Sequence, residues 1–374
     1  MAANAAGARR FEYMLSGTGP MPFVPITSTA DTDPVLAQHA FPVDRLEDFL
    51  ADKVEGFTRP LHVGQFRGGM SNPTFMLTDG GGKRYVLRKK PPGKLLQSAH
   101  AVDREFRVIS ALAKTDVPVA KAYVLAEDES VIGQAFYVME HVEGRVIRDF
   151  ALPGHTQQSR HDHYADMGDV LARLHNVDFK AVGLEGYGRE GGYCARQVKR
   201  WSGQYEDSKT EDVPEMDKLI RWLGDRMPDA ETTTIVHGDY RMENAIYHPD
   251  RPEILAVIDW ELGTLGDPFS DLAYNCLNYY VGDPERGDIT GIDFADYGIP
   301  TEDAYVDLYC KSRGIERPEN WAFYLALSLF RLAAISQGVY KRGLDGNASS
   351  PDAMKRGAKA RALSEAGWRI AENA

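Results

Sequence analysis

Polar residues of three kinds gather between positions 237 and 261 of the chain. His237-Gly238-Asp239 forms a loop-like segment, Asn244 follows shortly after it, and Asp259 comes after an apolar run. A carboxylate such as Asp239 can accept the proton of a hydroxyl group, whereas a second carboxylate and an amide oxygen suit Mg²⁺. The pattern predicts phosphoryl transfer from a nucleotide to an alcohol, with Asp239 acting on the hydroxyl and Asn244 and Asp259 binding the metal.

The residues around these groups predict a β-hairpin that brings them together. Residues 245–247 and 254–258 are apolar, and the segment between them, 248–252, contains two prolines and is typical of a turn. Asn244 enters the first expected strand and Asp259 leaves the second, so the hairpin places the two side by side. We therefore expect one metal site at the open end of this hairpin.

The same residues, together with Trp260 and Glu261, resemble the catalytic and metal motifs of the aminoglycoside phosphotransferase and choline kinase superfamily, which is related to the protein kinases. The resemblance extends over about residues 41–345. It implies that the protein is a small-molecule O-phosphotransferase that uses ATP and Mg²⁺. It also implies an α+β fold of two lobes like that of the protein kinases.

The order of the expected elements agrees with this fold. Strands separated by glycine-containing turns, with one helix among them, precede a longer part with helical apolar stripes. The expected strands cover residues 61–66, 74–78, 84–87, 121–125 and 135–139, and the helix covers 102–112. We expect a loosely ordered leader over residues 1–40, an antiparallel-sheet N-lobe over 41–141 and a larger, mainly helical C-lobe over 142–374.

A glycine-containing segment of the N-lobe is the expected phosphate-covering loop. Gly68, Gly69, Ser71 and Asn72 lie between two expected strands, where such a loop lies in kinases. Glycines let backbone N–H groups approach phosphates, and Ser71 and Asn72 add side-chain donors. The same glycines would also serve an ordinary tight hairpin.

In kinases a lysine of the third strand contacts the phosphates and pairs with a helix glutamate. Here Arg88 takes the lysine position, as in several members of the superfamily, and Glu105 is the matching acid. Lys89 or Lys90 would be the alternative, although strand alternation turns Lys89 away if Arg88 faces inward. A solvated surface residue is the other interpretation of Glu105.

The segment that joins the two expected lobes resembles the hinge of the family. The backbone of Glu140 and Val142 would hold the edge of the adenine, and Met139 would pack behind it. An ordinary strand followed by a glycine turn is the alternative interpretation.

Residues of the C-lobe are expected to choose the acceptor. Two stretches, residues 193–205 and 330–340, resemble those of the kinase-like domain fused to certain acyl-CoA dehydrogenases, which implies a hydroxyacyl-CoA or a related carboxylate-bearing metabolite as acceptor. Basic and aromatic residues there suit an anionic, partly apolar ligand, whereas a polycationic aminoglycoside would require carboxylates. The candidate acceptor residues are Arg196, Arg200, Trp201, Tyr205, Arg331 and Gln337.

Three alternatives stay open for this part of the chain. The aromatic residues would be core and the arginines a solvated face if the acceptor binds elsewhere. An aminoglycoside kinase or a sugar- or choline-type O-kinase would use the same catalytic core. A pseudokinase-like module would bind nucleotide without transferring phosphate.

Three further polar residues are expected to have structural roles. His237 would brace the catalytic loop, Asp267 would cap a helix, and Asp271 would hold the loop through its backbone, as the resemblance suggests.

Composition narrows the class of protein. The chain has 374 residues and a formal net charge of −12, which excludes a mainly electrostatic nucleic-acid binder. No continuous apolar run of about 20 residues predicts a membrane span, so we expect a cytoplasmic protein with a small-molecule partner. The three cysteines lack metal or disulfide spacing and are expected to be small buried hydrophobes. The sequence gives no indication of oligomeric state.

Overall fold

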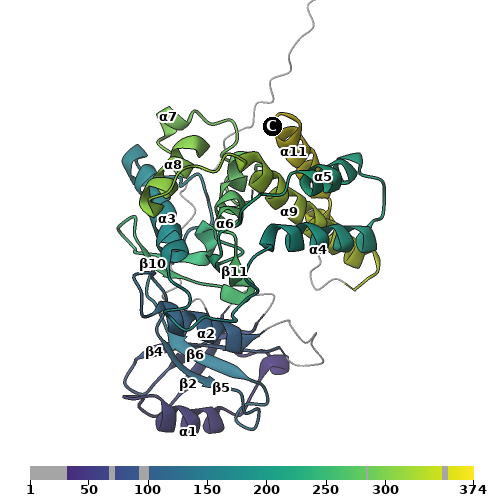
Figure 1. The fold of residues 1–374 in the computed structure, drawn as a ribbon. Helices are drawn as coiled ribbons and strands as arrows, with labels where there is room; N and C mark the ends of the chain where they lie inside the picture. The colour runs from purple at the N-terminus through teal and green to yellow at the C-terminus, as the bar shows by residue number, and fades with distance from the viewer. Residues whose placement is uncertain (1–31, 67–71, 92–100, 284, 348–352) are drawn as a thin grey trace, which may run out of the picture.

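The computed structural model describes residues 32–66, 72–91, 101–283, 285–347 and 353–374 (Figure 1). A small lobe built on an antiparallel sheet lies below a larger lobe that is mainly helical. This arrangement confirms the two-lobed α+β fold that the sequence predicts. Gly68, Gly69 and Ser71 of the expected phosphate loop lie outside the described residues, as do residues 1–31 of the expected leader.

The N-lobe sheet has six strands in the order β1-β2-β3-β4-β6-β5. Every neighbouring pair is antiparallel, and β3 and β4 pair in register from Thr74↔Arg88 to Thr78↔Arg84. The strands are β1 (Thr32–Asp33), β2 (His62–Phe66), β3 (Thr74–Thr78), β4 (Arg84–Lys89), β5 (Ala122–Ala126) and β6 (Phe136–Glu140). Apart from the short β1, they lie within one to two residues of the positions that the sequence predicts.

Two helices pack on the sheet. Helix α1 (Val43–Lys53) lies at the end of the molecule away from the C-lobe and buries Leu46 and Leu50 among the apolar side chains of the sheet. Helix α2 (Val102–Leu112) lies nearer the C-lobe, and its buried residues belong to the apolar core that continues into that lobe. Helix α2 is therefore the element through which the N-lobe packs on the catalytic half.

Residues 32–40 are part of this lobe, although the sequence predicts a loosely ordered leader there. Strand β1 pairs with β2, and the side chain of Gln65 accepts a hydrogen bond from the backbone of Leu36 at 3.0 Å. A two-residue strand at the edge of a sheet is held by backbone bonds and leaves no apolar periodicity that the sequence can reveal.

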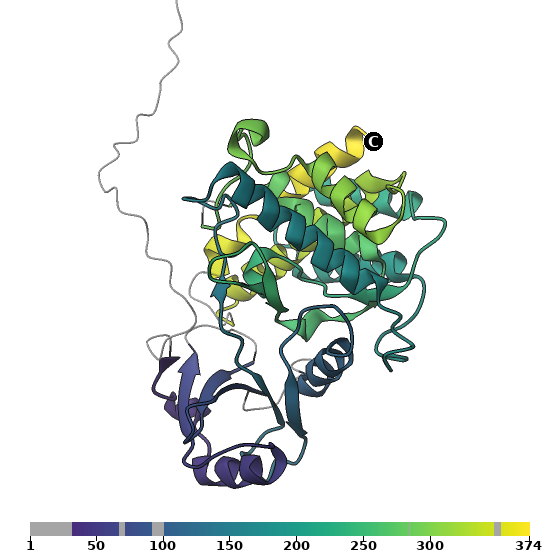
Figure 2. The ribbon, with the colours of Figure 1, turned by 90° about the vertical axis from the view of Figure 1, so that its left-hand side faces the viewer.

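The C-lobe is built around helix α9 (Trp321–Leu344), which packs against α4, α6, α10 and α11. Helix α3 packs against α8 on the other side of the lobe (Figure 2). The remaining helices are α3 (Gln157–Asn176), α4 (Tyr193–Ser208), α5 (Pro214–Asp225), α6 (Pro268–Asn275), α7 (Phe294–Tyr297), α8 (Glu302–Arg313), α10 (Ala353–Gly357) and α11 (Ala360–Glu372), with short 3₁₀ turns between some of them.

Helix α9 is also the one helix among the described residues that is long and apolar enough to cross a membrane. About two thirds, 67%, of its most apolar window is buried inside the molecule, as in the core helix of a globular lobe. Its apolar character is thus accounted for by packing within the lobe.

Two small antiparallel sheets carry the polar motif. Strands β7 (Arg145–Val146), β9 (Ala245–Tyr247) and β10 (Ile254–Val257) form one sheet in the order β10-β9-β7, and β8 (Thr234–Val236) pairs with β11 (Thr264–Gly266). The predicted hairpin is thus confirmed as β9 and β10. Strand β8 leads directly into the His237 loop.

Candidate active site

The catalytic hairpin brings Asn244 and Asp259 together as the sequence predicts. Val257 pairs with Ala245, and the amide of Ile258 donates to the carbonyl oxygen of Asn244 at 2.9 Å. Asp259 is the next residue, and its backbone adopts the left-handed conformation at φ 69°. That turn ends the strand and directs the chain into the short 3₁₀ turn Trp260–Leu262.

Asp239 is held by three side chains of the C-lobe. Tyr274 of α6 donates its hydroxyl to Oδ1 at 2.6 Å, and the Asn244 amide Nδ2 donates to Oδ2 at 2.9 Å. The guanidinium of Arg241 lies 3.3 Å from the same Oδ2. These contacts fix the carboxylate, which keeps 17% of its side-chain surface exposed.

The loop that carries Asp239 is braced from below by a buried aspartate. Asp271 accepts hydrogen bonds from the backbone amides of His237 at 2.6 Å and Gly238 at 2.8 Å. Although burial opposes its charge, contacts with His175 and with the amide of His237 lower the pKa of Asp271. Asp271 thus contacts the loop through its backbone, as expected for a residue that braces it.

His237 ties the same loop to the hairpin. Its Nε2 donates to the carbonyl oxygen of Ile258 at 2.9 Å, and its Nδ1 accepts from the amide of Asp239 at 3.2 Å. Both ring nitrogens are therefore engaged in hydrogen bonds within the protein, so the contacts of the imidazole are those of a group that holds the loop in place. Gly238 takes φ 82°, and a Cβ there would lie 2.9 Å from the carbonyl oxygen of Leu262, so glycine is required.

The donor set of the hairpin fits Mg²⁺ in a nucleotide complex. Nδ2 of Asn244 donates to two groups of Asp239, the carboxylate and the backbone carbonyl oxygen. The amide oxygen Oδ1 therefore points away from Asp239 and can serve as a metal ligand. Asp259 adds a carboxylate with 35% of its side-chain surface exposed. Within the described part of the chain no three acidic, His or Cys residues gather as a metal cage. Such a site suits a cation that also takes phosphate oxygens.

A second network joins the N-lobe to this site. Arg88 lies with Nε 3.1 Å from Glu105 and with Nη2 3.1 Å from Oδ1 of Asp259. Glu105 is buried and also accepts hydrogen bonds from Asn72 at 2.8 Å and Tyr137 at 2.9 Å. Burial opposes the charge of Arg88, but Tyr137 and the two carboxylates raise its pKa, so it is a cation here.

The neighbouring lysines do not share this position. Lys89 points to the opposite face of β4, is buried and donates to Gln134 at 3.0 Å, with its ammonium over the rings of Phe41 and Phe75. This burial lowers the pKa of Lys89. The backbone amide of Lys90 bonds to Ala135. Strand alternation thus resolves which cation of the strand pairs with Glu105.

The expected hinge lies where β6 leaves the N-lobe sheet. Met139 is partly buried against the core, and the amide of Glu140 donates to the carbonyl oxygen of Lys121 at 2.8 Å. The amide of Glu140 is therefore engaged at the edge of β5. Val142 follows in the connection to β7, partly buried.

Three of the expected acceptor residues, Arg331, Trp201 and Arg200, form a row of contacts that begins at the catalytic loop. Arg331 of α9 donates to the carbonyl oxygen of Gly238 at 2.8 Å, and its guanidinium lies over the rings of Tyr274 at 5.2 Å and Trp201 at 5.8 Å. The guanidinium of Arg200 also lies over the Trp201 ring, 5.0 Å from its centroid. Arginine and aromatic groups therefore meet within one residue of Asp239.

The other three expected acceptor residues have contacts elsewhere. Arg196 folds back and donates to the carbonyl oxygens of Gly191 and Arg189, before the start of α4. Tyr205 is buried in the C-lobe core, and Gln337 is buried and donates to Ser208 at 2.9 Å. Because these three side chains are engaged in contacts within the C-lobe, we leave them out of the acceptor site.

Comparison with known proteins places this site in a family. The phosphotransferase enzyme family matches residues 62–308, a range that includes Arg88, Asp239, Asn244 and Asp259. The chain belongs to the phosphotransferase enzyme family. A solved structure of a putative aminoglycoside phosphotransferase from Ralstonia eutropha is 48% identical, with a TM-score of 0.84 over 89% of this chain and 99% of that one. Choline kinase from Cryptosporidium parvum, at 11% identity and a TM-score of 0.61 over 88% of this chain and 96% of that one, shares the fold alone.

Longer proteins contain the closely similar sequence. The chain is 45% identical, over 91% of its length, to mouse acyl-CoA dehydrogenase family member 10, and 45% identical, over 88%, to probable acyl-CoA dehydrogenase IBR3 of Arabidopsis thaliana. It spans 32% and 43% of these two relatives, so it corresponds to one part of each. These matches confirm the expected resemblance to a kinase-like domain of acyl-CoA dehydrogenases.

Two residues that contact Asp239, Arg241 and Tyr274, were not singled out by the sequence. Arg241 lies two positions after Asp239, so its place inside the motif was the available signal. Tyr274 lies one helical turn after Asp271, and nothing local in the sequence shows that its hydroxyl reaches Asp239. Long-range packing of α6 under the catalytic loop makes that contact.

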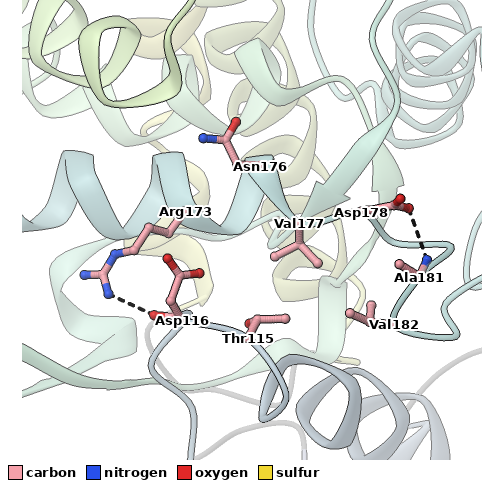
Figure 3. Close-up of a pocket in the computed structure, with 8 residues that line it drawn as sticks. All are labelled: Thr115, Asp116, Arg173, Asn176, Val177, Asp178, Ala181 and Val182. Carbon is pink, nitrogen blue, oxygen red and sulfur yellow. Dashed lines mark hydrogen bonds between the residues drawn. The ribbon is translucent and has the colours of Figure 1, made fainter.

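A cavity of about 350 Å³ lies apart from these residues (Figure 3). It is lined by the turn after α2 and by the end of α3, where Arg173 donates to the carbonyl oxygen of Asp116 at 2.8 Å. None of the expected nucleotide, metal or acceptor residues lines it. The catalytic assignment therefore depends on the hairpin and not on this cavity.

Proposed function

We propose that this phosphotransferase transfers the γ-phosphoryl group of ATP, as its Mg²⁺ complex, to a hydroxyl group of a small molecule. The observation that carries the proposal is a convergence of four side chains. Asp239 comes from the loop after β8, Asn244 and Asp259 from the two ends of the hairpin, and Arg88 from the other lobe. A proton acceptor, two oxygen ligands and a cation for the phosphates are the parts that this reaction needs.

Each part of the nucleotide site has a proposed partner. Asn244 Oδ1 and Asp259 would hold Mg²⁺, which when bound neutralises the phosphate charge. Arg88 would share its guanidinium between the phosphates and Asp259, while Glu105 keeps it in place. Asn72, expected to donate to the phosphates, instead donates to Glu105 and is better described as supporting Arg88. The adenine would meet the carbonyl oxygen of Glu140 and the amide of Val142.

Asp239 would orient the acceptor hydroxyl and take its proton. Its Oδ2 already has the Asn244 amide and the guanidinium of Arg241, so Oδ1 is the oxygen open to an acceptor. Replacement of Asp239 by asparagine should lower kcat by about 10²–10⁴-fold while leaving the affinity for Mg-ATP near normal.

We infer that the acceptor is a hydroxyacyl-CoA or a related carboxylate-bearing metabolite. Arg331 contacts the catalytic loop, and Trp201 and then Arg200 extend the row away from it. This cationic and aromatic row suits an anionic, partly apolar acceptor. The similar sequences occur within proteins named acyl-CoA dehydrogenases, which act on thioesters of this type by name. A polycationic aminoglycoside would meet two guanidinium groups there.

An aminoglycoside is nevertheless the second candidate, because the solved relative at 48% identity is described as a putative aminoglycoside phosphotransferase. The experiment is to incubate the protein with Mg-ATP and either a pool of hydroxyacyl-CoA thioesters or a pool of aminoglycosides, and to detect phosphorylated product by mass spectrometry. The variant Asp239→Asn, treated in the same way, is the negative control.

The outcomes separate the candidate functions. Phosphorylated thioester that is absent with Asp239→Asn supports both the reaction and the acceptor class. Phosphorylated aminoglycoside alone would replace the acceptor and keep the reaction. Binding of Mg-ATP with no ADP formed in either pool would favour the pseudokinase-like module, and unchanged turnover in Asp239→Asn would remove Asp239 from its role.

A further inference from the structure

The two oxygens of the Asp239 carboxylate have unequal surroundings. A carboxylate oxygen accepts about two hydrogen bonds. Oδ2 has two donors, the Asn244 amide at 2.9 Å and the Arg241 guanidinium at 3.3 Å. Among the residues that the structure describes, Oδ1 has one donor, the hydroxyl of Tyr274 at 2.6 Å. One position on Oδ1 is therefore left for an acceptor hydroxyl, directly beside the Tyr274 oxygen.

Tyr274 is itself held firmly in this place. Its ring comes from the last turn of α6, the helix whose Asp271 braces the catalytic loop. The guanidinium of Arg331 lies over the ring at 5.2 Å and at the same time donates to the carbonyl oxygen of Gly238. The ring and the loop that carries Asp239 are thus fixed relative to each other by a common cation.

A phosphotransferase must also keep water from taking the place of its acceptor. An aspartate that could rotate, with both positions of one oxygen open, would hold a water molecule as readily as an alcohol. The Tyr274 hydroxyl opposes rotation of the carboxylate, because it holds Oδ1 in place. It also occupies one of the two hydrogen-bonding positions of Oδ1.

We propose that Tyr274 is a positioning residue that orients the Asp239 carboxylate and restricts Oδ1 to a single partner, so that phosphoryl transfer favours the acceptor hydroxyl over water. This inference rests on the proposed function, since it assumes that Asp239 acts on a hydroxyl. Tyr274 itself does not take the phosphoryl group or the proton. Its contribution is measured by how ATP consumption divides between transfer and hydrolysis.

The test compares Tyr274→Phe with the wild-type protein. ADP is quantified together with phosphorylated product, using Mg-ATP and whichever of the hydroxyacyl-CoA and aminoglycoside pools the wild type phosphorylates. The ratio of ADP to phosphorylated product should rise about tenfold, the effect expected for one hydrogen bond to a charged group. The kcat for transfer should fall, while the KM for ATP stays the same.

The matched control is Tyr279→Phe, which removes a hydroxyl that donates to the carbonyl oxygen of Pro300 at 3.0 Å in the same lobe. It should leave the ratio at the wild-type value, and an equal rise in both variants would overturn the proposal. An unchanged ratio in Tyr274→Phe would overturn it too, as would a loss of Mg-ATP affinity, because the hydroxyl has no proposed part in nucleotide binding. A wild-type protein that forms no ADP would instead refute the proposed function.

Discussion

The two carboxylates to which we assign roles in the reaction, Asp239 and Asp259, are held in different ways. Asp239 contacts Tyr274, Asn244 and Arg241, all of its own lobe, whereas the side chain of Asp259 contacts Arg88 of the N-lobe. Asp259 is also the more exposed of the two, at 35% against 17% of its side-chain surface. In the described part of the chain, Asp239 is therefore held by side chains of the C-lobe, whereas Asp259 is coupled to the position of the N-lobe.

The largest effect is expected where this coupling is removed. Asp259→Ala deletes the proposed metal ligand and frees Arg88, so both Mg-nucleotide affinity and kcat should fall, the latter by about 10³-fold or more. Isothermal titration with Mg-ATP and steady-state kinetics measure the two quantities. Asp239→Asn, by contrast, should lower kcat alone.

The exposed Asp250 in the turn of the same hairpin provides the control for this prediction. Asp250→Ala should bind and turn over Mg-ATP as the wild type does. Retention of nucleotide affinity in Asp259→Ala would show that the metal is held elsewhere, and the contrast between the two carboxylates would then disappear.

The C-lobe half of the comparison depends on the brace under the loop. The Asp271 carboxylate accepts hydrogen bonds from the backbone N–H groups of His237 and Gly238. Asp271→Asn keeps the size of the side chain, but its NH₂ group then faces one of these two N–H donors. One lost hydrogen bond with a facing donor should lower the free energy of unfolding by about 2 kcal/mol. The kcat should fall about tenfold, because Asp239 is carried by this loop.

Urea unfolding and kinetics check this prediction, with Asp169→Asn as a control on the half-exposed face of α3. If Asp271→Asn keeps wild-type stability and kcat, the catalytic loop does not need its brace. The pKa of Asp271 lies below its ordinary value, because contacts with His175 and His237 outweigh the effect of burial. Its contribution to stability is therefore present above the ordinary value and is lost as the pH falls through the lowered pKa.

The parts of the site that the sequence predicted are those encoded locally. The hairpin follows from two short apolar runs and a turn, and the facing of Arg88 follows from strand alternation. The contacts of Tyr274 and Arg331 with the Asp239 loop join residues 35 and 93 positions apart, so no local pattern contains them. The same limit applies to Gln337, which lies in a stretch chosen for its resemblance to the family, because a local stretch does not distinguish a residue of a cleft from one of a helix–helix contact.

The coupling of Asp259 to the N-lobe is tested by replacing two neighbouring cationic residues of β4, Arg88 and Lys89. Arg88→Lys keeps the charge, but a single ammonium cannot hold Glu105 and Asp259 at 3.1 Å each as the guanidinium does. The KM for ATP should rise about tenfold, with a smaller change in kcat. Lys89→Met is the matched variant, because Lys89 is buried on the other face of β4.

In Lys89→Met the KM for ATP should not change. Removal of a buried ammonium whose pKa is lowered by burial should also leave the protein at least as stable as before. A rise in KM with Lys89→Met and none with Arg88→Lys would reverse the assignment of the phosphate-side cation.

The smallest effect concerns Asp267, which caps α6 and lies on the same helix as Asp271. Its carboxylate accepts from the amide of Phe269 at 2.9 Å, but burial raises its pKa from the ordinary value of 3.8 to about 7. The unfolded chain therefore loses this proton more readily, so the group opposes folding increasingly as the pH rises from about 4 to about 7. Asn caps a helix as well as Asp does and carries no charge.

Asp267→Asn should accordingly be more stable than the wild type near pH 8, on the order of 1 kcal/mol, with a smaller difference near pH 5. Thermal unfolding at the two pH values measures this. Asp293→Asn changes an exposed cap of α7 and should show no such pH dependence. An equal difference at both pH values would mean that Asp267 is ionised throughout, and that α6, which carries Tyr274 to the catalytic base, begins at a charged cap instead of a neutral one.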